Sequence, residues 1–151
     1  SGNKAETPET MVSAAATYSE IGKMCHDLGL GFAYHNHNWE LENDCEILDV
    51  LLAETGEEVS LVLDIAWAHV AGLDPDKLLQ HTASRIAYLH IKDVRERTFC
   101  ELGTGEVDFA TYLRLITEHG LEWIVVEQDE TTLGAEESMR INRTFLRELG
   151  L

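Results

Sequence analysis

Four short apolar runs, separated by segments with helical periodicity, restrict the fold of this chain more than any other feature. Each run has the length of a strand and ends in a polar residue; the runs are 31–37, 60–64, 86–90 and 123–127. Parallel strands need a connection about as long as a helix, whereas antiparallel strands do not. The sequence therefore predicts an α/β fold of parallel βα units with right-handed crossovers, in the order α-βα-βα-βα-βα.

The segments between the runs carry the signals that start and stop helices. Thr7 and Pro8 fit the first positions of a helix that ends at Gly29, and Asp74-Pro75 begins another. Further helices are predicted near 47–52, 109–120 and 135–149 from the spacing of their apolar residues. No linker or low-complexity stretch interrupts the order, so residues 1–151 are expected to form a single domain.

Composition argues against two classes of partner. The chain has 28 Asp and Glu against 11 Lys and Arg, a formal net charge of −17, which predicts no nucleic-acid binding and no docking to an anionic membrane. No apolar run reaches the length of about 18 residues that a membrane span needs. Cys25, Cys45 and Cys100 are odd in number and lack CxxC spacing, which predicts reduced thiols and a cytoplasmic protein.

The residues that end the runs can bind a divalent metal. They are Asp64, His90 and Glu127, with His35 or His37 at the end of the first run. The carboxyl ends of parallel strands meet at one edge of a sheet, so these side chains are expected to lie close together. Simpler roles remain open at this point: Asp64 as a helix cap, His90 as a packing residue, and Glu127 as the partner of a cation.

Two neighbours of these residues have predicted supporting roles. Lys92 is the cation available to pair with Glu127, because an unpaired charge at the end of an apolar strand is costly. Asp93 is a possible hydrogen-bond acceptor for His90, since a histidine ligand needs a partner that fixes its tautomer.

The segment 34–40 holds the densest group of polar side chains. His35 and His37 point to the same side of an extended strand and could be ligands, general bases or hydroxyl-binding groups, or could bind only backbone carbonyls. Trp67 could stack against a sugar ring or pack against the sheet. Gly103-Thr104-Gly105 could hold a phosphate through its N–H groups or form a plain turn.

Taken together, these segments resemble the xylose isomerase-like superfamily, also called AP endonuclease family 2, which includes sugar phosphate isomerases and epimerases. The resemblance rests on 34–41, 63–67, 71–75, 90–93, 103–109 and 126–129, and it covers nearly the whole chain. It implies a TIM (β/α)₈ barrel with one divalent metal at the ends of its last four strands. By this resemblance Asp64, His90 and Glu127 are metal ligands.

The resemblance leaves the fourth ligand open between Glu40 and His35. Many members carry a Glu where this chain has His35, and members with a Tyr-His-Asn-His strand usually keep a Glu slightly later, which here is Glu40. The nuclease branch carries a His at the position of Trp67, so the resemblance does not favour DNA repair.

Only part of the barrel is expected in this chain. A closed (β/α)₈ barrel takes about 250 residues and eight strands, whereas these 151 residues supply four. The resemblance assigns them to the C-terminal half, and a four-stranded parallel sheet alone would leave one face uncovered. We expect either that an N-terminal half-barrel is missing from the sequence or that two copies pair as a homo-oligomer.

The resemblance implies an isomerase or epimerase that acts on a sugar or sugar phosphate, with one Mn²⁺, Zn²⁺, Co²⁺ or Mg²⁺ ion stabilising an enediolate. Glu127, His35 or His37 would move the proton, Lys92 would lie near the developing oxyanion, and Trp67 would contact the substrate. The alternative is a lyase or dehydratase on a keto-sugar or keto-inositol, similar to inosose dehydratase. A further alternative is a non-catalytic half-barrel that binds or assembles.

Overall fold

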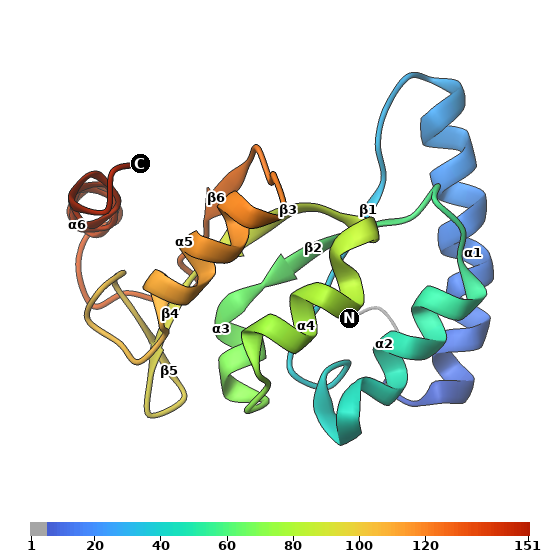
Figure 1. The fold of residues 1–151 in the computed structure, drawn as a ribbon, viewed down its shortest axis with the longest axis horizontal. Helices are drawn as coiled ribbons and strands as arrows, with labels where there is room; N and C mark the ends of the chain where they lie inside the picture. The colour runs from blue at the N-terminus through green and yellow to red at the C-terminus, as the bar shows by residue number, and fades with distance from the viewer. Residues whose placement is uncertain (1–5) are drawn as a thin grey trace.

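A computed structural model describes residues 6–151 and contains one parallel sheet with helices packed around it (Figure 1). The sheet consists of β1 (Ala33–His35), β2 (Ser60–Asp64), β3 (Ile86–Ile91) and β6 (Ile124–Val126), in that spatial order. Every neighbouring pair runs parallel. The predicted parallel βα units are therefore confirmed.

Six α-helices connect or flank the strands of the described chain. They are α1 (Pro8–Asp27), α2 (Glu42–Glu54), α3 (Ile65–Val70), α4 (Pro75–Thr82), α5 (Phe109–Glu118) and α6 (Ala135–Glu148), and a 3₁₀ turn at Ala83–Arg85 precedes β3. Thr7 and Asp74 cap α1 and α4 as the sequence predicted. Within residues 6–151 no helix has both the length and the apolar character needed to cross a bilayer.

The two faces of the sheet have different surroundings. On β3, Leu89 and Ile91 are buried in the core that forms with the helices, whereas Tyr88 and His90 on the opposite face are only half-buried. Side chains alternate between the faces of a strand, so Lys92 continues the face of His90. This second face is the one on which the polar residues gather.

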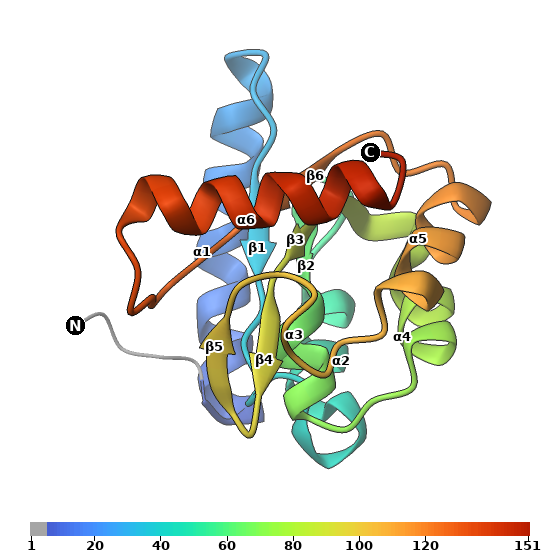
Figure 2. The ribbon, with the colours of Figure 1, turned by 90° about the vertical axis from the view of Figure 1, so that its left-hand side faces the viewer.

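A hairpin and a short helix lie beyond the carboxyl ends of the strands (Figure 2). The strands β4 (Asp93–Arg95) and β5 (Thr98–Cys100) pair antiparallel through a turn in which Glu96 and Arg97 have positive φ. The sequence predicted only a loop at the hairpin and gave no bounds for a helix at α3, although a helix cap was one of the roles left open for Asp64. Elements of three to six residues are too short to show a hydrophobic period, which explains both omissions.

Candidate metal centre

The ends of all four parallel strands converge on one point. Asp64 and His90 are register partners on β2 and β3, while His35 ends β1 and Glu127 follows β6. One ligand atom from each of these four residues lies within 4.8 Å of the others. The structure thus brings together one polar residue from the end of each of the four strands.

Asp64 divides its two carboxylate oxygens between two roles. Oδ1 accepts hydrogen bonds from the backbone N–H groups of Ala66 at 2.9 Å and Trp67 at 3.0 Å, and so caps α3. Oδ2 is buried and accepts no well-aligned hydrogen bond from the described residues, although it lies 3.4 Å from His35 Nε2. The helix-cap role is therefore present, and the second oxygen still faces the centre.

The donor atoms fit a divalent metal ion. His35 Nε2 and Asp64 Oδ2 are both buried and make no hydrogen bond of good geometry in the described chain. The basic groups near Asp64 Oδ2 are His35 Nε2 at 3.4 Å and Lys92 Nζ at 3.1 Å. His90 Nδ1 and Glu127 Oε2 lie 2.9 Å apart and complete a set of two nitrogen and two oxygen donors. Such a mixed set suits Zn²⁺, Mn²⁺ or Co²⁺.

Lys92 lies beside this group and is almost fully buried, with 1% of its side chain exposed. Its Nζ is 2.7 Å from Asp129 Oδ2, 2.8 Å from Glu127 Oε2 and 3.1 Å from Asp64 Oδ2. Burial alone would lower the pKa of Lys92, but the three carboxylates outweigh burial and raise it. Burial would likewise raise the pKa of Asp64 and of Glu127, yet their polar and charged partners hold both below the ordinary value.

Glu40, one of the two residues predicted as the fourth ligand, does not join the group. Its fully buried carboxylate accepts hydrogen bonds from the Tyr34 hydroxyl and, at 2.8 Å, from the His37 backbone N–H. Burial is the main cause that raises the pKa of Glu40. Because its oxygens already serve the 34–40 segment, the prediction of Glu40 as a ligand needs correction, and His35 is the alternative that the geometry favours.

Asp93 does not accept a hydrogen bond from His90, contrary to the prediction. Its buried carboxylate accepts from the N–H groups of Gly103 at 3.0 Å and Gly105 at 2.8 Å, and from two further backbone N–H groups. The partner of His90 is Glu127 instead. The two glycine N–H groups are therefore used inside the protein, which argues against the phosphate-holding alternative for this turn.

Aromatic rings border the centre on the side of the hairpin. The ring of His37 stacks on Trp39 with centroids 4.1 Å apart and is 5.9 Å from Trp67. Trp67 in turn meets Phe99 of β5 edge to face at 5.0 Å. Lys92 Nζ is 4.7 Å from the Phe99 centroid and 5.7 Å from that of Trp67. Trp67 and His37 thus lie close to the centre without belonging to the four-residue group.

Two residues of this region were not predicted from the sequence. Asp129 stands two positions after Glu127, and the alternation of side chains along extended backbone could have indicated that both face the same way. Phe99 had no comparable signal, because its position depends on the unpredicted hairpin.

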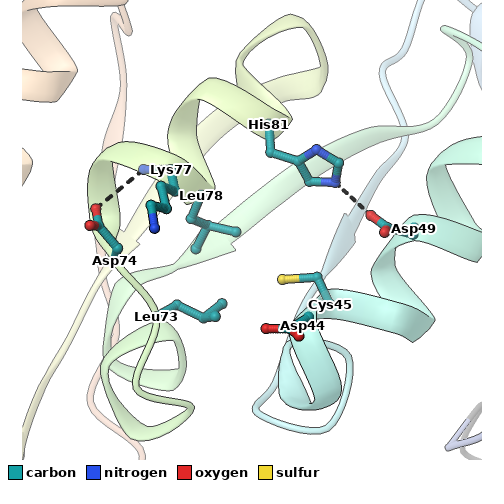
Figure 3. A pocket seen from close by; sticks show the side chains of 8 residues that line it. All are labelled: Asp44, Cys45, Asp49, Leu73, Asp74, Lys77, Leu78 and His81. Atoms are coloured by element: carbon teal, nitrogen blue, oxygen red, sulfur yellow. Dashed lines mark hydrogen bonds and ion pairs between the residues drawn. The ribbon is translucent and has the colours of Figure 1, made fainter.

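A separate hollow of about 240 Å³ lies on the helical side of the molecule, between α2 and α4 (Figure 3). Its lining consists of Asp44, Cys45, Asp49, Leu73, Asp74, Lys77, Leu78 and His81. We call it the α2–α4 hollow. None of the four residues of the candidate metal centre lines it.

Comparison with known proteins places the chain among barrel proteins. A family model described as xylose isomerase-like TIM barrel matches residues 1–149. Rhizopine catabolism protein MocC of Rhizobium meliloti is 30% identical over 74% of this chain and 41% of its own length. An inosose dehydratase of Geobacillus kaustophilus is 32% identical over 71% of this chain and 42% of its own length. The chain spans about half the length of the curated relatives it matches.

Solved structures share the fold at lower identity. A sugar phosphate isomerase/epimerase from Parabacteroides distasonis superposes with a TM-score of 0.83 at 22% identity, covering 97% of this chain and 55% of that one. The IolI protein, whose crystal structure contains a zinc atom, gives a TM-score of 0.75 at 20% identity over 94% of this chain and 57% of that one. The four-stranded sheet therefore corresponds to part of a TIM barrel.

Proposed function

Because the chain belongs to the xylose isomerase-like TIM barrel family, we propose that it forms one wall of a metal-dependent enzyme that moves a proton next to the carbonyl of a sugar-like substrate. The observation that carries this proposal is the buried ammonium of Lys92, in contact with Asp64 and Glu127 of the metal group. A buried cation next to metal ligands is expected where a substrate oxygen gains negative charge.

In this proposal His35, Asp64, His90 and Glu127 hold one divalent ion. The ion, when bound, supplies a Lewis acid that polarises a substrate carbonyl. Zn²⁺, Mn²⁺, Co²⁺ and Mg²⁺ remain the candidate ions. The crystal structure of the IolI protein, which shares the fold, contains a zinc atom, and this supports a metal-binding role without deciding the ion for this chain.

The protein groups have separate proposed tasks. Lys92 donates a hydrogen bond to the oxygen that becomes negative as the neighbouring C–H bond breaks. His37 accepts the proton, and Glu127 or His35 is a candidate for that task only where it is not a ligand. Trp67 and Phe99 exclude water from one side of Lys92, which strengthens its interaction with the oxygen.

Two outcomes for the substrate fit the same first step. In dehydration the C–H proton goes to the base, and the hydroxyl on the next carbon leaves as water after an acid protonates it. A carbon–carbon double bond conjugated to the carbonyl results. In isomerisation or epimerisation the proton returns to carbon instead, and no water is lost.

We favour dehydration of a cyclic keto-polyol. The supporting observation is that several inosose dehydratases are among the sequence relatives, at up to 32% identity. Epimerisation of a keto-sugar is the second candidate, supported by the fold shared with an L-ribulose 3-epimerase and a sugar phosphate isomerase/epimerase.

Deuterium incorporation tests the shared step. The protein is loaded with Zn²⁺ or Mn²⁺ and incubated in D₂O with a keto-inositol and, separately, with a ketohexose. NMR should detect deuterium at the carbon next to the carbonyl. An ultraviolet band from an enone would indicate dehydration, and an epimer with unchanged mass apart from deuterium would indicate epimerisation. Loaded protein that exchanges no proton in either substrate would contradict the proposal and favour a non-catalytic wall.

We also propose that four more βα units complete the site. The edge strands of the described sheet are β1 and β6. Large apolar side chains are exposed near both edges: Leu28 and Leu30 just before β1, and Trp123 and Val125 at β6. The units could come from a longer polypeptide or from a second copy of the chain. Sedimentation equilibrium separates them, because pairing of copies gives twice the mass of one chain.

A further inference from the structure

Asp129 lies in the segment that follows β6 and makes the shortest contact with Lys92. Its Oδ2 accepts a hydrogen bond from Nζ at 2.7 Å. The Asp129 side chain is 40% exposed, whereas the lysine that it holds is almost fully buried. Asp129 is not one of the four residues whose donor atoms face one another. It therefore binds the lysine from outside the metal group.

The other two carboxylates that contact Lys92 belong to that group. They are Asp64 and Glu127, at 3.1 and 2.8 Å from Nζ. The lysine and a divalent ion would thus bind to the same two carboxylates. Two cations that share anions at such distances repel each other, so each weakens the binding of the other unless a further anion is supplied.

The charges of the cluster balance only when Asp129 is included. Asp64, Glu127 and Asp129 together carry three negative charges. One protonated lysine and one divalent ion carry three positive charges. Removal of Asp129 leaves two carboxylates for the same three positive charges, and a net positive site attracts a cation less strongly.

We propose that Asp129 is a positioning residue: it anchors the ammonium of Lys92 so that Asp64 and Glu127 stay available to a divalent ion. This inference rests on the proposed metal site but not on the proposed reaction. A purely structural ion pair is the competing explanation. A purely structural pair has no reason to change metal affinity.

A double-mutant cycle separates the two explanations. Zn²⁺ affinity is measured by competition with a chromophoric chelator for wild-type protein, Asp129→Asn, Lys92→Met and the double variant. Asp129→Asn should bind Zn²⁺ about tenfold more weakly, equivalent to about 1.4 kcal/mol. Lys92→Met should bind at least as tightly as wild type, because the competing cation is gone. In the Lys92→Met background, Asp129→Asn should change affinity less than about threefold.

Two further variants control the cycle. Glu130→Gln removes the neighbouring exposed carboxylate and should leave Zn²⁺ affinity within about twofold of wild type, which tests for a general charge effect. Asp129→Glu keeps the anion and should recover most of the affinity lost in Asp129→Asn. Circular dichroism checks folding; if Lys92→Met does not fold, Lys92→Gln takes its place in the cycle.

The possible results lead to different conclusions. Unchanged affinity in Asp129→Asn, or the same tenfold loss with and without Lys92, would overturn the role of Asp129 and leave the metal site intact. Wild-type protein that binds no Zn²⁺ would overturn both. Absence of deuterium exchange together with the expected cycle would overturn the proposed reaction and leave this inference standing.

Discussion

The carboxyl end of the sheet and the α2–α4 hollow contain similar side chains in different states. Each has aspartates, a histidine and a lysine. In the hollow, His81 and Asp49 are about half exposed and pair with each other, while Asp74 caps α4, which begins at the next residue (Figure 3). At the sheet end, His35 Nε2 and Asp64 Oδ2 are buried without hydrogen-bond partners in the described chain.

This contrast shows which property of a group of polar side chains indicates a ligand-binding site. A hollow lined by solvated, locally paired groups has no unmet requirement for a ligand. Buried carboxylates and histidines that converge on one point do have such a requirement, because the carboxylates carry more negative charge than the single ammonium of Lys92 balances. The sheet end is therefore the better candidate site.

The largest difference is expected from the two aspartates that cap helices. Asp64→Ala and Asp74→Ala each remove an N-cap and should each cost about 1 kcal/mol of stability through the lost cap. Only Asp64→Ala should abolish stoichiometric divalent-metal binding, because only Asp64 has an oxygen in the metal group. Elemental analysis after dialysis measures this; equal metal content in the two variants would contradict the contrast.

Removal of a lysine from each region is the next test. Lys92→Met should slow deuterium exchange into the substrate about a hundredfold, because the developing oxyanion loses its cation. Lys77→Met, which changes the lining of the hollow, should leave exchange unchanged. The two rates are measured by NMR with the same metal-loaded protein and substrate. A similar decrease in both variants would indicate a general loss of structure instead.

The cysteine that lines the hollow, Cys45, should also react slowly with alkylating reagents. Burial, together with Asp49 and Asp44, raises the pKa of the Cys45 thiol to about 11 from an ordinary value of 9.0. At pH 8 this higher pKa lowers the fraction of Cys45 present as thiolate about a hundredfold. A more basic thiolate is also a better nucleophile, which raises the reaction rate again by about tenfold. Iodoacetamide should therefore modify Cys45 at least about tenfold more slowly in native than in urea-unfolded protein, as peptide mass spectrometry can show.

The smallest effect is expected at the pair in the hollow. His81→Ala removes the partner of Asp49, but both side chains are about half exposed. Such pairs contribute less than about 1 kcal/mol. Urea unfolding should detect little change, and metal content should equal that of wild type. A large loss of stability would show that the hollow contributes more to the fold than its exposure indicates.

The sequence predicted the parallel strands because each is an apolar run that ends in a polar residue. It also predicted that these four ends meet, since the ends of parallel strands share one edge of the sheet. Asp64, His90 and Glu127 follow from this rule, whereas the choice of His35 over Glu40 came only with the structure. Their roles as ligands remain a prediction.

The errors concern side chains whose partners come from distant irregular segments. Asp93 was expected to accept a hydrogen bond from His90, but the turn at Gly103–Gly105 folds over it and takes its oxygens. Glu40 was one of the two residues considered for the fourth ligand, but its carboxylate accepts a hydrogen bond from the Tyr34 hydroxyl instead. The alternation of side chains along a strand predicts the face of the sheet on which a residue lies, but it does not predict which loop packs against that residue.

The capping of α3 by Asp64 has a consequence for ion selectivity. Two backbone N–H groups already bind Oδ1, so the carboxylate can offer a cation only Oδ2 unless the first turn of α3 unwinds. Large ions such as Ca²⁺ often take both oxygens of a carboxylate, whereas Zn²⁺ is satisfied with few, directional donors. The hydrogen bonds that cap the six-residue helix α3 would thus make the site less suitable for Ca²⁺ than for Zn²⁺.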